Sequence, residues 1–300
     1  MLELQDITYS REATIAAITD YYKFLTQMYL HDSQVVYPPE TGWPSIIEAA
    51  RNPTSMREFG KSDEVMDLLA HLPYVVSAGI ESGIYAGPVC APYTPFINWS
   101  QRLIPWGPSL DGEVLRLVTE GPAFAKFRVP HAFGLTSGCR ETPIMVLDVK
   151  LGIVHWEDCP NSIAYGQHRE RVDYGDGPVD EDGDEDEDEN GEEHEDGDED
   201  EDENGEEHED GDEARDGDRD NVSPEEIGWR QSADAWTIPD FFEVLKNEFR
   251  TLNWIPFDPC NVWDARWSEF PDQEGLASAV QDVYRQHGWP DLSVYRKIEL

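Results

Sequence analysis

The sequence predicts an α+β protein, in which an antiparallel β-sheet with helices packed on it forms a single domain that a disordered acidic loop interrupts. Three observations predict this class. Apolar residues recur with helical spacing near both ends of the chain, and short β-rich runs separated by turn residues lie between them. A long acidic run follows the β-rich part. We therefore assign 1–172 and 221–300 to one domain and 173–220 to the insertion.

The first predicted element is a helix over residues 11–31. Ser10 can cap its N-terminus, and Glu12 lies in its first turn, where an acidic side chain is favourable. One apolar stripe follows the helical repeat and consists of Ile15, Ile18, Tyr22, Leu25 and Tyr29. Such a stripe either binds a partner or packs on a core, and the large globular remainder of this chain favours the core.

A rigid loop and short helices are predicted next. Residues 37–44, with the sequence YPPETGWP, form the loop, because proline fixes its own φ and restricts the residue before it. Helices are expected over 45–51, 62–72 and 113–120. The last of these is expected to stop at Gly121-Pro122.

The sheet is predicted within residues 130–156. The apolar run 144–147 shows no alternation, which is typical of a central strand that is buried on both faces. Turn residues separate this run from a β-rich segment before it and from residues 153–156 after it. Three short strands joined by turns predict an antiparallel meander at the core of the domain.

The segment 173–220 contains 30 acidic and 2 basic residues, so it carries −28 of the formal net charge of −42. The sequence EDGDEDEDENGEEH occupies 181–194 and is repeated unchanged at 195–208. The repeated block has no apolar residue to bury, so we expect it to be disordered and self-repelling. The negative charge of this segment could attract basic proteins such as histones. Alternatively, the segment serves only as a solvated spacer.

Structured sequence resumes after the insertion, near Gly228-Trp229. A helix is expected over 240–252, an extended segment over 254–257 and a final helix over 273–287. Gly288 fits the C′ position of that final helix, and Pro290 lies just beyond it.

Charge and cysteine usage exclude several classes of protein. Both parts of the chain are acidic, which argues against direct nucleic-acid binding and against binding to an anionic membrane surface. No apolar run is long enough to span a membrane, and the N-terminus lacks a secretory signal. None of the cysteines forms a C-x-x-C pair: Cys90, Cys139, Cys159 and Cys260. We expect an intracellular protein, cytoplasmic or nuclear, with reduced thiols.

The sequence predicts no catalytic residue, no metal ligand and no cofactor. Ser137 stands one position too late for a nucleophile elbow, which needs serine at the centre of G-x-S-x-G. His155, Glu157 and Cys159 would share one side of an extended chain and could bind zinc. A structural zinc site usually has a second, separated pair of ligands, so a polar loop with a packed cysteine is the preferred interpretation.

Two further candidates are set aside on similar grounds. The acidic repeats resemble the start of an EF-hand loop, but Gly197 and Gly211 occupy the twelfth position, where a glutamate is required. His71 and His131 are interpreted as structural histidines, because neither a nucleophile nor an orienting carboxylate can be assigned to them.

Aromatic residues supply the candidate binding surface. The region 77–108 is rich in proline, glycine and aromatic residues, which predicts loops and short extended pieces. Its aromatic side chains either line a groove or fix a long loop to the sheet. The candidate binding residues on the folded domain are Tyr37, Trp43, Trp99 and Trp106.

Two resemblances arise from these segments. The YPPETGWP loop, the VLDVKLGIVHW strands and the PDFFEVLKNEFRTLNWIP helix resemble a family of filamentous-fungal proteins of unknown activity. The order of elements is also similar to the SUKH superfamily, which includes a yeast cell-wall assembly regulator and bacterial toxin-immunity proteins. The matching pieces are residues 72–74, 147–154 and 240–245. This resemblance implies an α+β protein-binding module and assigns no functional residue.

The sequence therefore favours a non-catalytic protein-interaction or regulatory module of the SUKH type. One alternative is an enzyme of hydrolase type whose active-site residues are distributed over loops. Another is a protein that binds basic partners through its acidic loop.

Overall fold

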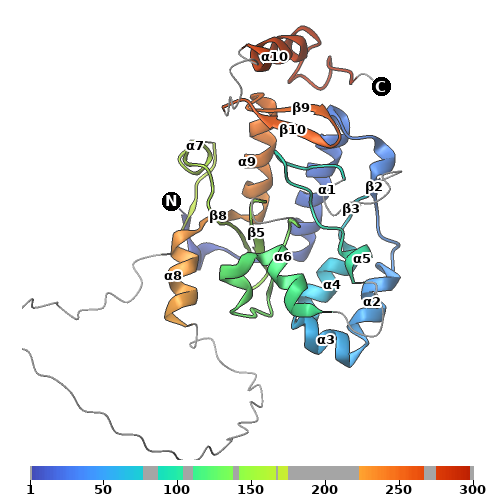
Figure 1. Ribbon diagram of the computed structural model, residues 1–300, viewed down its shortest axis with the longest axis vertical. Helices are drawn as coiled ribbons and strands as arrows, with labels where there is room; N and C mark the ends of the chain where they lie inside the picture. Colours follow the sequence, from blue (N-terminus) through green and yellow to red (C-terminus); the bar gives the residue numbers. More distant parts are fainter. Residues whose placement is uncertain are drawn as a thin grey trace, which may run out of the picture.

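A four-stranded antiparallel sheet lies within the computed structural model, with helices packed on both of its faces (Figure 1). In spatial order its strands are β4 (Ala132–Gly134), β5 (Met145–Asp148), β6 (Ile153–Trp156) and β8 (Asp234–Thr237). The α+β class and the predicted meander are therefore confirmed. Strand β8 extends that meander and is not among the predicted strands. It has only four residues, and its partner β6 lies far earlier in the chain, so its sequence pattern is too short to identify it.

The structure describes residues 2–76, 87–103, 111–137, 142–166, 168–174, 223–266 and 275–297. Trp106, Cys139 and the acidic repeats with their EF-hand-like starts lie outside these ranges, as do residues 77–86 and 104–108 and most of the insertion. Asp173, which belongs to strand β7, and Tyr174 are both described, so the structured part extends two residues into the segment assigned to the insertion.

The two faces of the sheet bury different clusters, as the two-residue period of a strand requires. Met145 and Leu147 point into the main hydrophobic cluster, whereas Val146, between them, packs in a second cluster with Phe124 and Trp229. Every residue of β5 is buried. The prediction that this apolar run forms a central strand with both faces covered is confirmed.

The helices largely follow the predicted periodicity. Those before the sheet are α1 (Arg11–Met28), α2 (Pro44–Ala50), α3 (Pro53–Phe59), α4 (Asp63–His71), α5 (Trp99–Arg102) and α6 (Gly112–Ala125). Those after β6 are α7 (Asn161–Ala164), α8 (Pro224–Ser232), α9 (Ile238–Arg250) and α10 (Leu276–Gln286). Two short 3₁₀ helices are η1 (Leu4–Asp6) and η2 (Asp32–Gln34). Helices α3, α5, α7 and α8 are not among the predicted helices.

Capping residues define several helix ends. The hydroxyl groups of Ser10 and Ser62 accept hydrogen bonds from backbone N–H groups in the first turns of α1 and α4. Helix α6 breaks at Gly121, whose φ of 76° is left-handed, and one further helical turn follows. The stop predicted at Gly121-Pro122 is therefore a kink rather than the end of the element.

Three two-stranded sheets complete the described fold. Strand β1 (Leu2–Glu3) pairs in parallel with β7 (Val172–Asp173), and β2 (Val35–Val36) pairs with β3 (Tyr74–Val75). The extended segment predicted over 254–257 is strand β9 (Trp254–Asp258), which forms an antiparallel hairpin with β10 (Asn261–Asp264).

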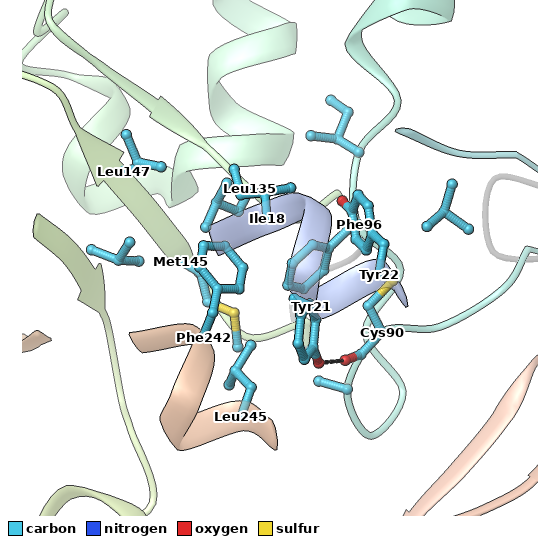
Figure 2. Close-up of a cluster of buried hydrophobic side chains, with 14 of the residues drawn as sticks. Ile18, Tyr21, Tyr22, Cys90, Phe96, Leu135, Met145, Leu147, Phe242 and Leu245 are labelled. Atoms are coloured by element: carbon cyan, nitrogen blue, oxygen red, sulfur yellow. Dashed lines mark hydrogen bonds between the residues drawn. The ribbon is translucent and has the colours of Figure 1, made fainter. Parts of the chain in front are cut away.

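The main core forms where α1 and α9 pack against each other and against the inner face of the sheet (Figure 2). Tyr21 and Phe242, one from each helix, have ring centroids 5.4 Å apart. The Tyr21 hydroxyl donates to the carbonyl of Cys90, which satisfies a polar group that is fully buried. The predicted stripe of α1 thus packs mainly on the core.

Among the described helices, none combines the length and the apolar character that crossing a lipid bilayer requires.

Candidate functional site

A buried polar cluster lies on the outer face of the sheet, beneath α8. Asp148 on β5 and His155 on β6 have no exposed surface, and Arg230 of α8 reaches both. The Arg230 Nη1 atom lies 3.0 Å from Asp148 Oδ2 and 3.3 Å from His155 Nε2. Its other nitrogens, Nε and Nη2, donate to Glu226 one helical turn away. The guanidinium group therefore connects α8 to two strands.

The hydrogen bonds of His155 indicate which of its ring nitrogens carries the proton. Arginine can only donate, so Nε2 of His155 accepts, and the neutral ring carries its proton on Nδ1. The Tyr174 hydroxyl lies 2.9 Å from that Nδ1 atom. Burial, reinforced by the positive charge of Arg230, lowers the pKa of His155 from its usual 6.5 to about 3.

The same cluster places a carboxylate beside His131. The sequence offers no orienting carboxylate for this residue, but Nε2 of His131 lies 3.5 Å from Asp148 Oδ2. Burial lowers the pKa of His131, and the negative charge of Asp148 opposes that change. The pair resembles an acid–base arrangement, but the fully buried carboxylate already accepts from Arg230 and from the backbone N–H of Leu151.

The zinc candidate gains no support from this geometry. His155 uses its ring nitrogens within the polar cluster, and burial raises the pKa of the Cys159 thiol, which disfavours the thiolate that zinc binds. In the part of the chain that the structure describes, no three potential ligands come together as a metal site.

A second buried ion pair joins α6 to the segment before α4. Lys61 Nζ lies 2.6 Å from Glu120 Oε1, and neither side chain is exposed. Burial lowers the pKa of Lys61 and raises that of Glu120, while the attraction between the two opposes both changes. Since solvent does not reach it, this pair is structural.

The accessible candidate site is a pocket of about 500 Å³ between α10 and the β9–β10 hairpin, which we call the C-terminal pocket. Its lining comes from the end of α1, from β9, from α10 and from the tail that follows α10: Met28, Tyr29, His31, Pro256, Phe257, Asp258, Pro259, Val280, Val283, Tyr284, His287, Tyr295, Arg296 and Lys297. Figure 1 shows α10 at one end of the molecule, beyond the hairpin. Volume and apolar lining are in the range of ligand-binding pockets.

Helix α10 presents its apolar side to this pocket. Val280, Val283, Tyr284 and His287 recur with helical spacing and all line it. No residue of α10 is buried, and Val283 is 49% exposed. An amphipathic helix normally buries this face, so α10 has apolar surface that the described part of the chain does not cover.

Hydrogen bonds and aromatic anchors attach the C-terminal segment to the rest of the fold. The indole of Trp289 donates to the Phe249 carbonyl over 3.0 Å, and the Tyr295 hydroxyl donates to the Met28 carbonyl over 3.1 Å. The Tyr284 hydroxyl donates to the Pro256 carbonyl. Burial raises the pKa of both tyrosines, so their hydroxyl groups stay protonated and engaged while their rings line the pocket.

The structure separates the residues that the sequence proposes for binding. Tyr37 is 50% exposed, and Trp43 is partly buried, with its indole donating to the Leu72 carbonyl. Trp99 is 1% exposed and donates to the Gly134 carbonyl of β4. Trp99 therefore fixes its loop to the sheet, which was the alternative interpretation, and cannot touch a partner here.

Sequence reasoning missed the C-terminal pocket. The helix itself is predicted, and the spacing of its apolar residues is visible in the sequence. What the sequence does not show is that Trp289 and Tyr295, together with Tyr284 of this stripe, hold the segment in place.

Comparison with known proteins gives no relationship: no family model matches the chain, and no curated protein or solved structure is significantly similar to it. Function therefore has to be inferred from the pocket and the buried clusters.

Proposed function

We propose that this protein is a non-catalytic protein-interaction module of the SUKH type, and that apolar side chains of its partner dock in the C-terminal pocket. The observation that carries the proposal is the uncovered apolar face of α10, which lines a pocket of about 500 Å³. Removing such a face from water on binding is favourable, because burial of apolar surface contributes roughly 25 cal/mol per Å².

Exposed apolar residues support the same location. The described residues include ten exposed large hydrophobic side chains, and four of them lie between residues 276 and 294. They are Leu276, Val283, Leu292 and Val294; Val283 lines the pocket, and the others lie elsewhere on α10 and the tail after it. Apolar surface concentrated in one short segment is typical of a protein-binding site, whereas isolated exposed apolar residues are normal.

The enzyme alternative is less well supported by the described residues. The titratable groups of the polar cluster, Asp148 and His155, have no exposed surface and cannot meet a substrate. In the C-terminal pocket, the Asp258 carboxylate accepts hydrogen bonds from its own hairpin turn. A general base normally needs access to the reacting proton, and the polar cluster does not offer it.

A pair of valines provides the test. Val283 lines the pocket and is 49% exposed, and Val114 on α6 is 52% exposed and lies elsewhere in the fold. The full-length protein, V283D and V114D would each be immobilised and incubated with a fungal lysate, and retained proteins would be identified by mass spectrometry. We expect at least one salt-stable partner that V283D loses and V114D keeps.

Equal retention of every partner by V283D would show that the pocket is not the docking site. Loss of binding in V114D alone would place the partner on α6, where Leu117 and Val118 are also exposed. Because both valines are half exposed, an aspartate at either position leaves no charge buried in a core, and circular dichroism would verify that both variants fold.

A further inference from the structure

Basic side chains gather at the C-terminal pocket of a strongly acidic protein. The chain has a formal net charge of −42. Among the described residues that line the pocket, four have basic side chains and one, Asp258, is acidic. The basic residues are His31, His287, Arg296 and Lys297. The rim of this pocket therefore differs in charge from the protein as a whole.

Several of these groups keep donors available. The Nδ1 atom of His31 accepts from the backbone N–H of Ser33, so the neutral ring carries its proton on Nε2. Arg296 uses Nη1 to donate to two backbone carbonyls, and within the described residues nothing accepts from its Nε or Nη2. An anion at the rim would find donors that contacts among the described residues leave unused.

Lys297 and Asp258 are the other charged residues that line the pocket, and their contacts leave the donors of His31 and Arg296 available. Lys297 donates to the carbonyls of Thr26 and Leu30, which are uncharged, and among the described residues it pairs with the largely exposed Asp32 at 3.5 Å. Exposed pairs of this kind interact weakly. Asp258 accepts hydrogen bonds from the backbone of Cys260 and from the side chain of Asn261, so its hairpin already satisfies its oxygens.

We propose that the partner segment that enters the C-terminal pocket has a carboxylate next to its apolar side chains, and that this carboxylate lies against Arg296 and His287. This inference rests on the proposed function and names the chemistry of the partner. Guanidinium and carboxylate groups form charge-assisted, often bidentate hydrogen bonds. The net charge of the protein repels an anionic segment at long range, but salt screens that repulsion beyond about 8 Å at physiological ionic strength. At short range, contact of the partner's carboxylate with the basic side chains of the rim then favours binding.

A series of eight-carbon probes tests whether the pocket prefers a carboxylate at the end of an apolar chain. Octanoate, 1-octanol and octylammonium share one apolar body and differ in charge, and binding of each to the full-length protein would be measured by isothermal titration calorimetry. We expect octanoate to bind about tenfold more tightly than octylammonium, with 1-octanol between them, as one charge-assisted contact predicts.

Matched arginine variants locate the preference. In R296Q/H287Q the difference between octanoate and octylammonium should fall to less than about twofold, while binding of 1-octanol is unchanged. Arg285 lies on α10, pairs with Asp282 and does not line the pocket, so R285Q should behave as the unchanged protein. Retained binding of 1-octanol also shows that the double variant keeps its pocket.

A peptide pair tests the source of the carboxylate. Acetyl-leucyl-phenylalanyl-leucine would be compared with its C-terminal amide, and we expect the free carboxylate to bind more tightly, with the difference lost in R296Q/H287Q. If octanoate shows the preference and both peptides are excluded, the occupant is a small amphiphile and the proposed protein source is wrong.

The experiments distinguish failure of the inferred carboxylate from failure of the proposed docking pocket. If the three eight-carbon probes bind equally well, and V283D weakens all of them, the pocket takes apolar groups but the inferred carboxylate is wrong. If none of the probes binds, the proposed function of the pocket falls together with the inference.

Discussion

The imidazole of His155 is neutral in the folded protein because its surroundings cannot accommodate a second proton. Its ring stacks on Tyr174 at a centroid distance of 5.8 Å, and Arg230 donates to Nε2. Protonation would place a cation beside the guanidinium group in a fully buried site. A sequence motif does not reveal this state, since His155 looks like one of several histidines beside a strand.

This residue predicts a pH dependence of stability. The pKa of His155 is about 3 in the folded state and near 6.5 without the fold, so between these values the unfolded chain binds more protons. The free energy of unfolding should therefore fall as the pH falls through this range, by about 1.4 kcal/mol per pH unit for this group. Urea unfolding between pH 6 and pH 4 would measure the slope.

The variant H155Q isolates the contribution of His155 to the pH dependence of stability, because glutamine does not titrate and the other titratable residues remain in the chain. We expect its unfolding free energy to fall less steeply with decreasing pH than that of the unchanged protein. Parallel curves for the two proteins would show that His155 does not bind the additional proton.

At the scale of elements, α8 is attached to the sheet by an ion pair and to α6 by aromatic packing. Arg230 pairs with the fully buried Asp148, and Trp229 packs on Phe124 with ring centroids 4.4 Å apart. The variant R230M should lower the free energy of unfolding by roughly 3–5 kcal/mol, because it leaves a buried carboxylate without its cation. Chemical denaturation would measure the loss.

The double variant R230M/D148N provides the control. Asparagine keeps an acceptor for the backbone N–H of Leu151 but carries no charge, so part of the lost stability should return. A loss below about 1 kcal/mol in R230M would contradict the assignment of Arg230 as the link between α8 and the sheet.

The elements that the sequence predicts are the long or strongly patterned ones. Helices α1, α4 and α9 have capping residues and apolar stripes, and β5 has a continuous apolar run. Elements such as α3 and β8 escape prediction because their few residues carry too little pattern and their neighbours supply the stabilising contacts. For α6, the glycine that predicts an end instead produces a kink.

At the scale of the whole molecule, the segments before and after 175–222 both pack on His155. Tyr174 stacks on His155, and Trp229 packs on the same ring with centroids 5.2 Å apart. Contacts outside the insertion therefore hold Tyr174 and α8 in place.

We predict that the acidic insertion is dispensable for folding. Replacing residues 180–220 by a short glycine–serine linker should leave the thermal midpoint unchanged or raise it, because charge repulsion and the entropy cost of loop closure both decrease. Differential scanning calorimetry would measure the midpoint. A variant of full length, in which serine and asparagine replace the acidic residues of 195–208, separates the two causes. A large loss of helix and strand signal by circular dichroism in the shortened protein would show that the insertion belongs to the fold.

The sequence by itself determined the α+β class, the meander, the long helices and the acidic character, since periodicity, capping and composition are local properties of the chain. The tertiary structure decided which of these elements meet. It placed Trp99 in the core, brought Arg230 to Asp148 and His155, and left the apolar face of α10 on an open pocket. These outcomes depend on contacts between residues far apart in the chain, and such contacts leave no local pattern because many partners could bury the same stripe.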